Sequence, residues 1–234
     1  MSFSKISRSW LAIVTAVSCL FAISASAQSN VTVRVMAANL NGNSQTLGTP
    51  QLNILKGLKA DIVAMQEFEY TSATTNGVNT PAAFREMIDA TFGTNFVYFR
   101  EEGYSLPNGI ISRYPIVASG SFDDTEVSNR GFAWAQINLP GTNDLYIVSV
   151  HLLTTGSTER NTEATNLKAY IEANFPSNAW IVVAGDFNTD SRSEAAVTTF
   201  KTFLSDSPIP TTTAIPIQTY LATSRTITCC RASQ

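Results

Sequence analysis

Apolar and polar residues recur along the first part of the chain in two periods, and these periods predict strands and helices in turn. The segment VTVRVMAAN (31–39) has apolar residues at every second position, which is typical of a half-buried strand. Thr49 and Pro50 can cap and open a helix with leucines at three-residue spacing. The apolar run in DIVAMQE (61–67) then predicts a buried strand.

The same alternation continues through most of the chain. Thr80 and Pro81 predict the start of a second helix, which would bury Phe84, Met87 and Ile88. Further strands are expected over 96–99, 109–112, 131–139, 144–152 and 180–188, and further helices over 158–175 and 192–204. No internal repeat and no linker interrupts this order, so the pattern predicts one α/β domain.

Length and composition agree with a single folded domain. The chain has 234 residues, of which 44% are hydrophobic and 14% charged, a balance that suits a sizeable core and not a disordered chain. Its three cysteines provide no disulfide framework, because Cys19 lies near the N-terminus and Cys229 and Cys230 are adjacent. The core must therefore stabilise the domain on its own.

The first 27 residues are typical of an export signal. Lys5 and Arg8 precede an apolar run over 11–23, and Ala25-Ser26-Ala27 follows as a signal-peptidase site. A membrane anchor is disfavoured because the run is shorter than the ~20 residues of a spanning helix. A lipoprotein site at Cys19 is also disfavoured, because that cysteine lies inside the run. We expect a secreted or periplasmic protein with no transmembrane segment after cleavage.

Charge argues against general attraction to nucleic acid. Cleavage would remove Lys5 and Arg8 and no acidic residue, which changes the formal net charge from −3 to −5. A mildly acidic protein has no overall electrostatic pull toward DNA, RNA or an anionic membrane. Recognition of phosphate must therefore be local.

Polar residues suited to catalysis stand at or just past the ends of predicted strands. They are Asn39, Glu67, His151, Asp186 and Asn188. Singly, each has a simpler interpretation as a turn, solvent-exposed or structural residue. Gathered at one rim of the sheet, they would suit a divalent cation and a phosphate: carboxylate and amide oxygens ligate Mg²⁺, while amide and imidazole N–H groups donate to phosphate oxygens.

Five segments resemble successive motifs of one superfamily. They are RVMAANLNG, DIVAMQEFE, NGIISRYPI, IVSVHL and VVAGDFNTD. From about residue 33 to residue 190, these segments are similar to the endonuclease/exonuclease/phosphatase superfamily, which includes pancreatic-type deoxyribonuclease, abasic-site endonucleases, bacterial sphingomyelinases and inositol-phosphate phosphatases. The resemblance implies a four-layer α/β/β/α sandwich of two mixed β-sheets and metal-dependent cleavage of a phosphate ester.

The resemblance also implies a metal site. Glu67 would be the principal Mg²⁺ ligand, with Asn39 beside it and Asn41 as a further ligand. Mn²⁺ and Ca²⁺ are alternative ions for the same oxygen donors.

Roles in catalysis follow from the same resemblance. His151 would serve in acid/base or phosphate-stabilising chemistry, and Asp186 would orient the nucleophilic water or a histidine. Asn188 would hold the scissile phosphate. Arg130 stands where several relatives place a phosphate-contacting arginine, but a surface arginine beside a strand is an equally good interpretation.

The substrate is specified less sharply than the chemistry. Basic residues are few and scattered, with no arginine-rich loop, no aromatic stacking run and no long apolar hairpin for insertion into a membrane. We expect a phosphodiesterase or nuclease, with nucleic acid among the candidate phosphate-ester substrates and no stable protein partner. The alternatives are a sugar- or inositol-phosphate phosphatase, and a catalytically impaired phosphate-binding protein. The last is kept because hydrolytic relatives carry a second histidine in a late Ser-Asp-His motif, whereas this chain has one histidine.

Residues 211–234 differ in composition from the rest of the chain. They contain no Asp or Glu, no clear strand alternation, and two adjacent cysteines. Codons written for ATSRTITCCRA (222–232) and read two bases later permit Asn-Lys-Pro-Tyr-Asp-Tyr-Val-Leu-Pro-Ser, which matches a strand that the family carries here. We therefore predict a domain over 28–210 that is incomplete at its C-terminus, followed by an aberrant, frameshifted tail over 211–234.

Overall fold

The computed structural model describes residues 32–40, 49–72, 74, 77–141, 143–205 and 225–229. The predicted export signal (1–27) and Asn41 lie outside these residues. Within the described ranges, no helix combines the length and apolar character that a membrane span requires.

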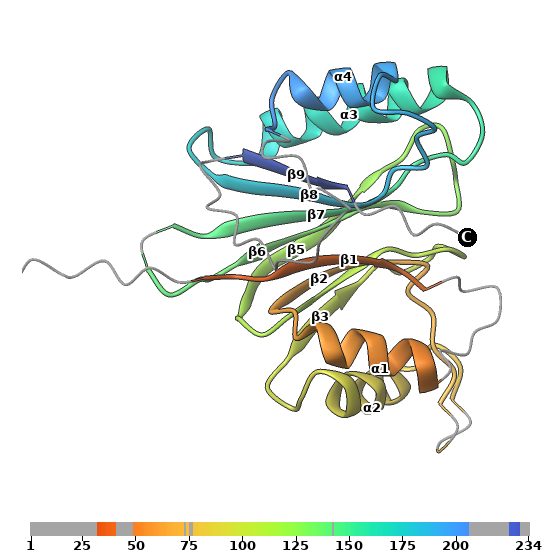
Figure 1. Cartoon of the computed structure of the whole chain (residues 1–234), viewed down its shortest axis with the longest axis vertical. Coiled ribbons are helices and arrows are strands. Elements are labelled where there is room, and N and C mark those ends of the chain that lie inside the picture. Colours follow the sequence, from red (N-terminus) through yellow and green to blue (C-terminus); the bar gives the residue numbers. More distant parts are fainter. Residues whose placement is uncertain are drawn as a thin grey trace, which may run out of the picture.

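Two mixed β-sheets face each other at the centre of the molecule (Figure 1). The four-stranded sheet has the order β1-β2-β4-β3 and consists of β1 (Val35–Asn39), β2 (Ile62–Gln66), β3 (Val97–Arg100) and β4 (Gly109–Ser112). The five-stranded sheet has the order β5-β6-β7-β8-β9 and consists of β5 (Ile116–Asp123), β6 (Gly131–Ile137), β7 (Leu145–His151), β8 (Trp180–Asp186) and β9 (Arg225–Cys229). Between the sheets, Ile62 and Ile110 belong to the same buried cluster as Ile147 and Val182.

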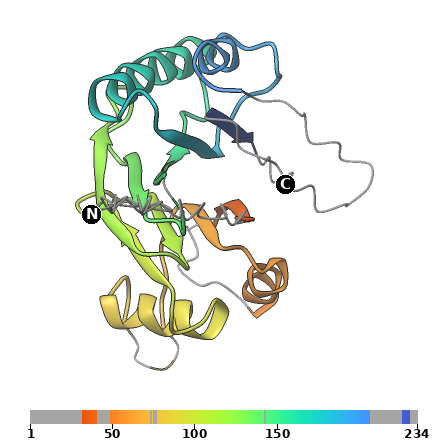
Figure 2. The same ribbon diagram turned by 90° about the vertical axis from the view of Figure 1, so that its left-hand side faces the viewer.

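Helices cover the outer face of each sheet (Figures 1 and 2). The four-stranded sheet carries α1 (Thr49–Leu58) and α2 (Pro81–Thr91), and the five-stranded sheet carries α3 (Ser157–Asn174) and α4 (Ala195–Lys201). Apolar residues of α2 and α3 pack on the strands beneath them in two further buried clusters. These layers confirm the predicted four-layer α/β/β/α sandwich.

Local sequence signals explain where these elements begin and which faces they bury. Thr80 caps α2, because its hydroxyl oxygen accepts a hydrogen bond from the N–H of Ala83 at 3.2 Å, and Pro81 follows in the first turn. Every residue of β2 is buried, since a sheet lies on one side of this strand and helices on the other. A strand covered on both faces has a continuous apolar run instead of an alternating one.

Two strands were not expected from the sequence. β5 is an edge strand whose side chains alternate between half-buried and exposed, so small polar residues obscure its period. β9 lies in the tail where no strand is expected, and its backbone pairs in parallel with β8. The remaining residues of 211–234 lie outside the described ranges, and the frameshift stays a prediction.

Candidate active site

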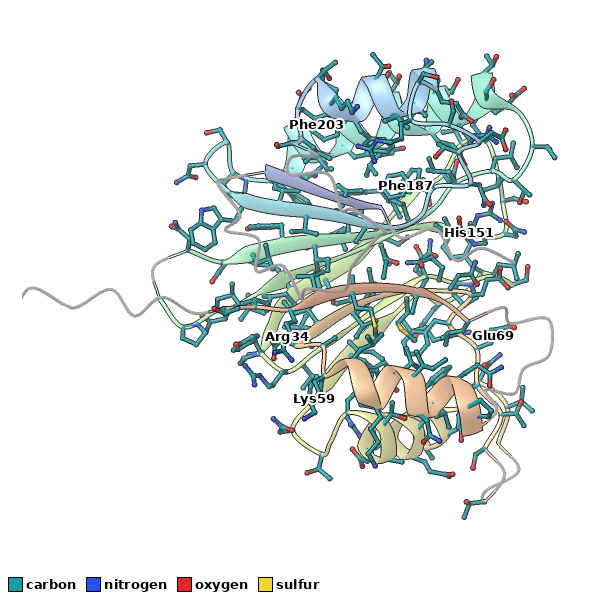
Figure 3. The ribbon with its side chains drawn as sticks, in the orientation of Figure 1. Arg34, Lys59, Glu69, His151, Phe187 and Phe203 are labelled. Atoms are coloured by element: carbon teal, nitrogen blue, oxygen red, sulfur yellow. The ribbon has the colours of Figure 1, made fainter. Side chains whose placement is uncertain are left out.

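Two parallel strand pairs bring the predicted site residues to one edge of the sandwich. In the four-stranded sheet, β1 and β2 are in a register that places Asn39 opposite Gln66, immediately before Glu67. In the five-stranded sheet, β7 and β8 are in a register that places His151 opposite Asp186. Figure 3 shows His151 on the same side of the molecule as Glu69, which follows β2. The carboxyl ends of these four strands therefore meet.

Asn39 joins the two halves of the site. Its amide nitrogen donates to Oε1 of Glu67 at 3.1 Å and to Oδ2 of Asp186 at 3.1 Å. The Nε2 atom of His151 lies 4.0 Å from the same Glu67 oxygen. Four residues singled out from the sequence thus lie around one point, although they come from two sheets.

Asn188 lies beside this group. Its backbone N–H donates to Oδ1 of Asp186 at 3.0 Å, and its side-chain amide donates to the carbonyl of Leu152 at 2.8 Å. Asn188 has a φ of 47° and Glu67 a φ of 49°, values that residues other than glycine adopt rarely. Such backbone strain clusters at functional sites, where the surrounding structure holds it in place.

Arg130 is buried behind the strand that carries His151. It is 4% exposed, so the interpretation as a surface arginine is wrong. Its guanidinium group donates to the carbonyls of His151 at 2.5 Å and Leu152 at 3.1 Å, and to the side chain of Asn129 at 3.1 Å. These contacts hold the backbone of the site. Contact between Arg130 and a substrate phosphate stays a prediction.

Burial keeps the imidazole of His151 uncharged. The side chain is 5% exposed, and desolvation together with the charge of Arg130 lowers its pKa to about 4, against the opposing influence of Asp186 and Glu67. At neutral pH the contact with Glu67 is therefore not an ion pair. The buried Nδ1 atom has no hydrogen-bond partner among the described residues.

The oxygen atoms around Glu67 are of the kind that hard divalent cations bind. Two carboxylates, of Glu67 and Asp186, share one amide donor, an arrangement that a cation would stabilise by neutralising charge. In the described part of the chain, no group of three His, Cys, Asp or Glu residues is arranged to hold a metal. An ion here would take one or two carboxylates and an amide oxygen, with water completing its shell, as Mg²⁺ commonly does.

Several residues that shape the site were not singled out from the sequence. Ser149 accepts a hydrogen bond from Gln66 at 2.8 Å and donates to the carbonyl of Met65 at 2.7 Å, which joins the sheets behind the site. Arg160 and Glu163 are buried on the inner face of α3. The sequence pattern could have revealed both residues, because they fall on the same helical face as the apolar residues of α3. A charged residue on a buried face needs a partner for its charge.

A family model described as "Endonuclease/Exonuclease/phosphatase family" matches residues 36–231. The chain belongs to the endonuclease/exonuclease/phosphatase family. No curated protein matches it by sequence.

Solved structures of endonuclease/exonuclease/phosphatase proteins share the fold. A family protein from Bacteroides thetaiotaomicron has a TM-score of 0.55 at 16% identity over 74% of this chain and 67% of that chain. A Bacteroides vulgatus protein gives 0.53 at 18% identity over 74% and 72%. D. rerio TDP2, crystallised with a single-strand DNA product, gives 0.52 at 17% identity over 72% of this chain and 66% of its own length.

These findings confirm the family and the fold that the sequence predicted. The chain spans 66% of the length of the D. rerio TDP2 chain, so the activity of a complete family protein is a proposal for this chain. At these identities the solved structures establish a shared fold, and substrate has to be argued from the site.

Proposed function

We propose that this protein is an exported, metal-dependent phosphodiesterase or nuclease. The observation that carries the proposal is the amide of Asn39, which bridges the carboxylates of Glu67 and Asp186, with His151 at 4.0 Å from Glu67. This arrangement supplies oxygen ligands for a cation and groups for proton transfer at one point, which is what cleavage of a phosphate ester requires.

Glu67 and Asn39 would hold the cation, and Asn41 would add a ligand from the segment after β1. Mg²⁺ is the ion we favour, with Mn²⁺ and Ca²⁺ as alternatives. A bound divalent cation would stabilise the negative charge that develops on the phosphoryl oxygens during in-line displacement.

The side chains of the five-stranded sheet would act on water and phosphate. Asp186 is fixed by hydrogen bonds to both of its oxygens, so its carboxylate can orient an attacking water. The amide nitrogen of Asn188 donates one hydrogen to Leu152, and its second hydrogen can donate to a phosphate oxygen. The neutral imidazole of His151 has one donor and one acceptor nitrogen, which suits phosphate stabilisation or proton transfer.

Two other functions are each supported by one observation on the sequence. The formal net charge, −3 for the full chain and −5 after the expected cleavage, favours a small phosphate ester over a long nucleic acid, so a sugar- or inositol-phosphate phosphatase is the second candidate. The presence of a single histidine supports a catalytically impaired phosphate-binding protein as the third. For the same reason we expect turnover to be about 10²-fold or more below that of a relative with both histidines.

Hydrolysis of bis-(p-nitrophenyl) phosphate tests the proposal. With Mg²⁺ the protein should release p-nitrophenol, and EDTA should stop the release. Glu67→Ala, His151→Ala and Asp186→Asn should each lower kcat by about 10²-fold or more. Glu172→Gln, an exposed change on α3, is the control that should keep the rate. Activity that survives His151→Ala would contradict the mechanism.

The substrate and the export proposal need separate measurements. Plasmid DNA, bis-(p-nitrophenyl) phosphate and sugar phosphates tested side by side would separate a nuclease or diesterase from a monoesterase.

N-terminal sequencing tests the export proposal. Protein recovered from outside the cytoplasm should have Gln28 as its first residue. Recovery of the chain with its first residues intact would overturn the export proposal.

A further inference from the structure

Two buried arginines hold the backbone that follows β7. Arg130 donates to the carbonyls of residues 151 and 152 at 2.5 and 3.1 Å. Arg160, on α3, donates to the carbonyls of residues 153 and 154 at 3.1 and 3.2 Å. Four consecutive carbonyl groups (151–154) therefore accept hydrogen bonds from the guanidinium groups of Arg130 and Arg160, residues that are 4% and 2% exposed.

Arg160 also reaches the loop that follows β8. Its Nε and one terminal nitrogen donate to the two oxygens of Glu194 at 2.9 Å each, and the same terminal nitrogen lies 3.4 Å from Asp190. Glu194 in turn accepts a hydrogen bond from the backbone N–H of Asp190 at 2.6 Å. With the two carbonyl contacts, Arg160 makes five hydrogen bonds, which equals the number of N–H donors that a guanidinium group carries.

The two loops that Arg160 joins are those that position the catalytic residues of the five-stranded sheet. Segment 151–154 begins at His151, the last residue of β7, and loop 187–194 contains Asn188. Near the site the loops also meet directly, because the side chain of Asn188 donates to the carbonyl of Leu152 at 2.8 Å. A shift of either loop would therefore change the distance between the imidazole and the amide.

We propose that Arg160 is a positioning residue that, together with Glu194, fixes the spacing between His151 and Asn188. This inference rests on the proposed function, because the spacing matters only if both residues act on one phosphate. A planar guanidinium group is needed to join the two loops. It binds a carboxylate on one loop through two parallel hydrogen bonds and still has N–H groups to donate to the other loop. A lysine ammonium group has three donors on one atom and cannot span both loops.

Steady-state kinetics of Arg160→Met test the inference, with Lys168→Met as the matched control. Lys168 is a cation on the same helix, but its contacts are with Thr202, Glu172 and the ring of Phe203, away from both loops. With bis-(p-nitrophenyl) phosphate and Mg²⁺, Arg160→Met should lower kcat by about 10-fold or more and change KM by less than about 3-fold, because misplacement of catalytic groups affects the chemical step. Lys168→Met should leave both constants within about 2-fold of wild type.

Arg160→Lys and Glu194→Gln separate positioning from general stability. Thermal denaturation should show a folded protein for each variant used in kinetics. Arg160→Lys keeps the charge and should not restore kcat, whereas Glu194→Gln keeps the size of the side chain and should give a smaller loss than Arg160→Met. If Arg160→Met does not fold, the effects of Arg160→Lys and Glu194→Gln on kcat and KM decide the inference.

The single histidine of the chain provides a readout that does not need activity. In NMR spectra of histidine-labelled protein, the imidazole signals of His151 should shift or broaden in Arg160→Met and stay in place in Lys168→Met. An unchanged kcat with unchanged His151 signals, or a change confined to KM, would overturn the inference. If the wild-type protein does not hydrolyse the ester, the proposed function fails, and the His151 signals alone decide whether Arg160 sets the position of the imidazole.

Discussion

Glu67 and Asn188 turn the chain sharply at the point where their strands end, and both do so with a positive φ. Asparagine tolerates this conformation better than glutamate does. For Glu67 the positive φ costs about 1 kcal/mol or more of folding free energy, and the contacts around the residue must offset this cost. A carboxylate held in this way faces Asn39 and His151 instead of solvent, which suits it to bind a cation.

The first prediction concerns metal binding by that carboxylate. In calorimetry, wild-type protein should bind Mg²⁺ or Mn²⁺, and Glu67→Ala should give no measurable binding heat, because the main anionic ligand is lost. Glu69→Ala removes a carboxylate two residues away that accepts a hydrogen bond from Asn79, and it should bind as wild type does. Equal binding by Glu67→Ala and wild type would show that the ion lies elsewhere.

The close approach of β7 and β8 depends on Gly185. A Cβ atom at this position would lie 2.0 Å from the carbonyl oxygen of Val150, and the residue has a φ of 154°. No side chain fits there unless the two strands separate. The strands deliver His151 and Asp186 opposite each other, so their separation would also open the site.

The second prediction is that Gly185→Ala destabilises the protein by about 3 kcal/mol or more, from the clash and the backbone strain together. Gly141→Ala is the matched control, because Gly141 also has a positive φ, of 137°, but a Cβ there meets nothing within 4 Å. Urea denaturation of both variants measures the difference. A similar loss in both would mean that backbone strain, and not the contact with Val150, limits this position.

The sequence predicted the elements near the site better than the two edge strands of the five-stranded sheet. Strands β2, β7 and β8 are covered on both faces, so their apolar runs are long and their ends are clear. β5 is an edge strand with few large apolar residues, and its period carried too little signal. Arg160 was missed for another reason: its partners lie in loops, and a helical pattern does not reveal which loops pack against it.

The whole molecule should respond to pH through a buried carboxyl group on α3. Both oxygens of Glu163 accept a hydrogen bond from the N–H of Leu153 at 3.0 Å, while Asp124 and Arg130 lie close enough to affect its charge. Burial, followed by the contact with Asp124, raises the pKa of Glu163 to about 8. The folded protein therefore keeps this proton at neutral pH, whereas the unfolded chain releases it near pH 4.5.

The third prediction follows from this difference in proton binding. A carboxyl group with a raised folded-state pKa stabilises the protein fully below the unfolded pKa, and that stability is lost as pH rises through the folded pKa. The free energy of unfolding should therefore fall between pH 4.5 and pH 8, with a contribution from Glu163 of up to about 1.4 kcal/mol per pH unit. Urea titrations at several pH values should show a smaller slope for Glu163→Gln. Parallel pH profiles for the variant and wild type would refute the assignment.

The hydrogen bond between Asn39 and Asp186 joins residues 147 positions apart, and it crosses from one sheet to the other. Closing so long a segment is entropically costly, and contacts of this kind form late when a chain folds. Each sheet alone holds half of the candidate site, so the proposed hydrolysis requires both sheets to be docked. During refolding, the time at which hydrolytic activity returns should therefore report when the two sheets dock. Activity should return later than the secondary structure measured by circular dichroism.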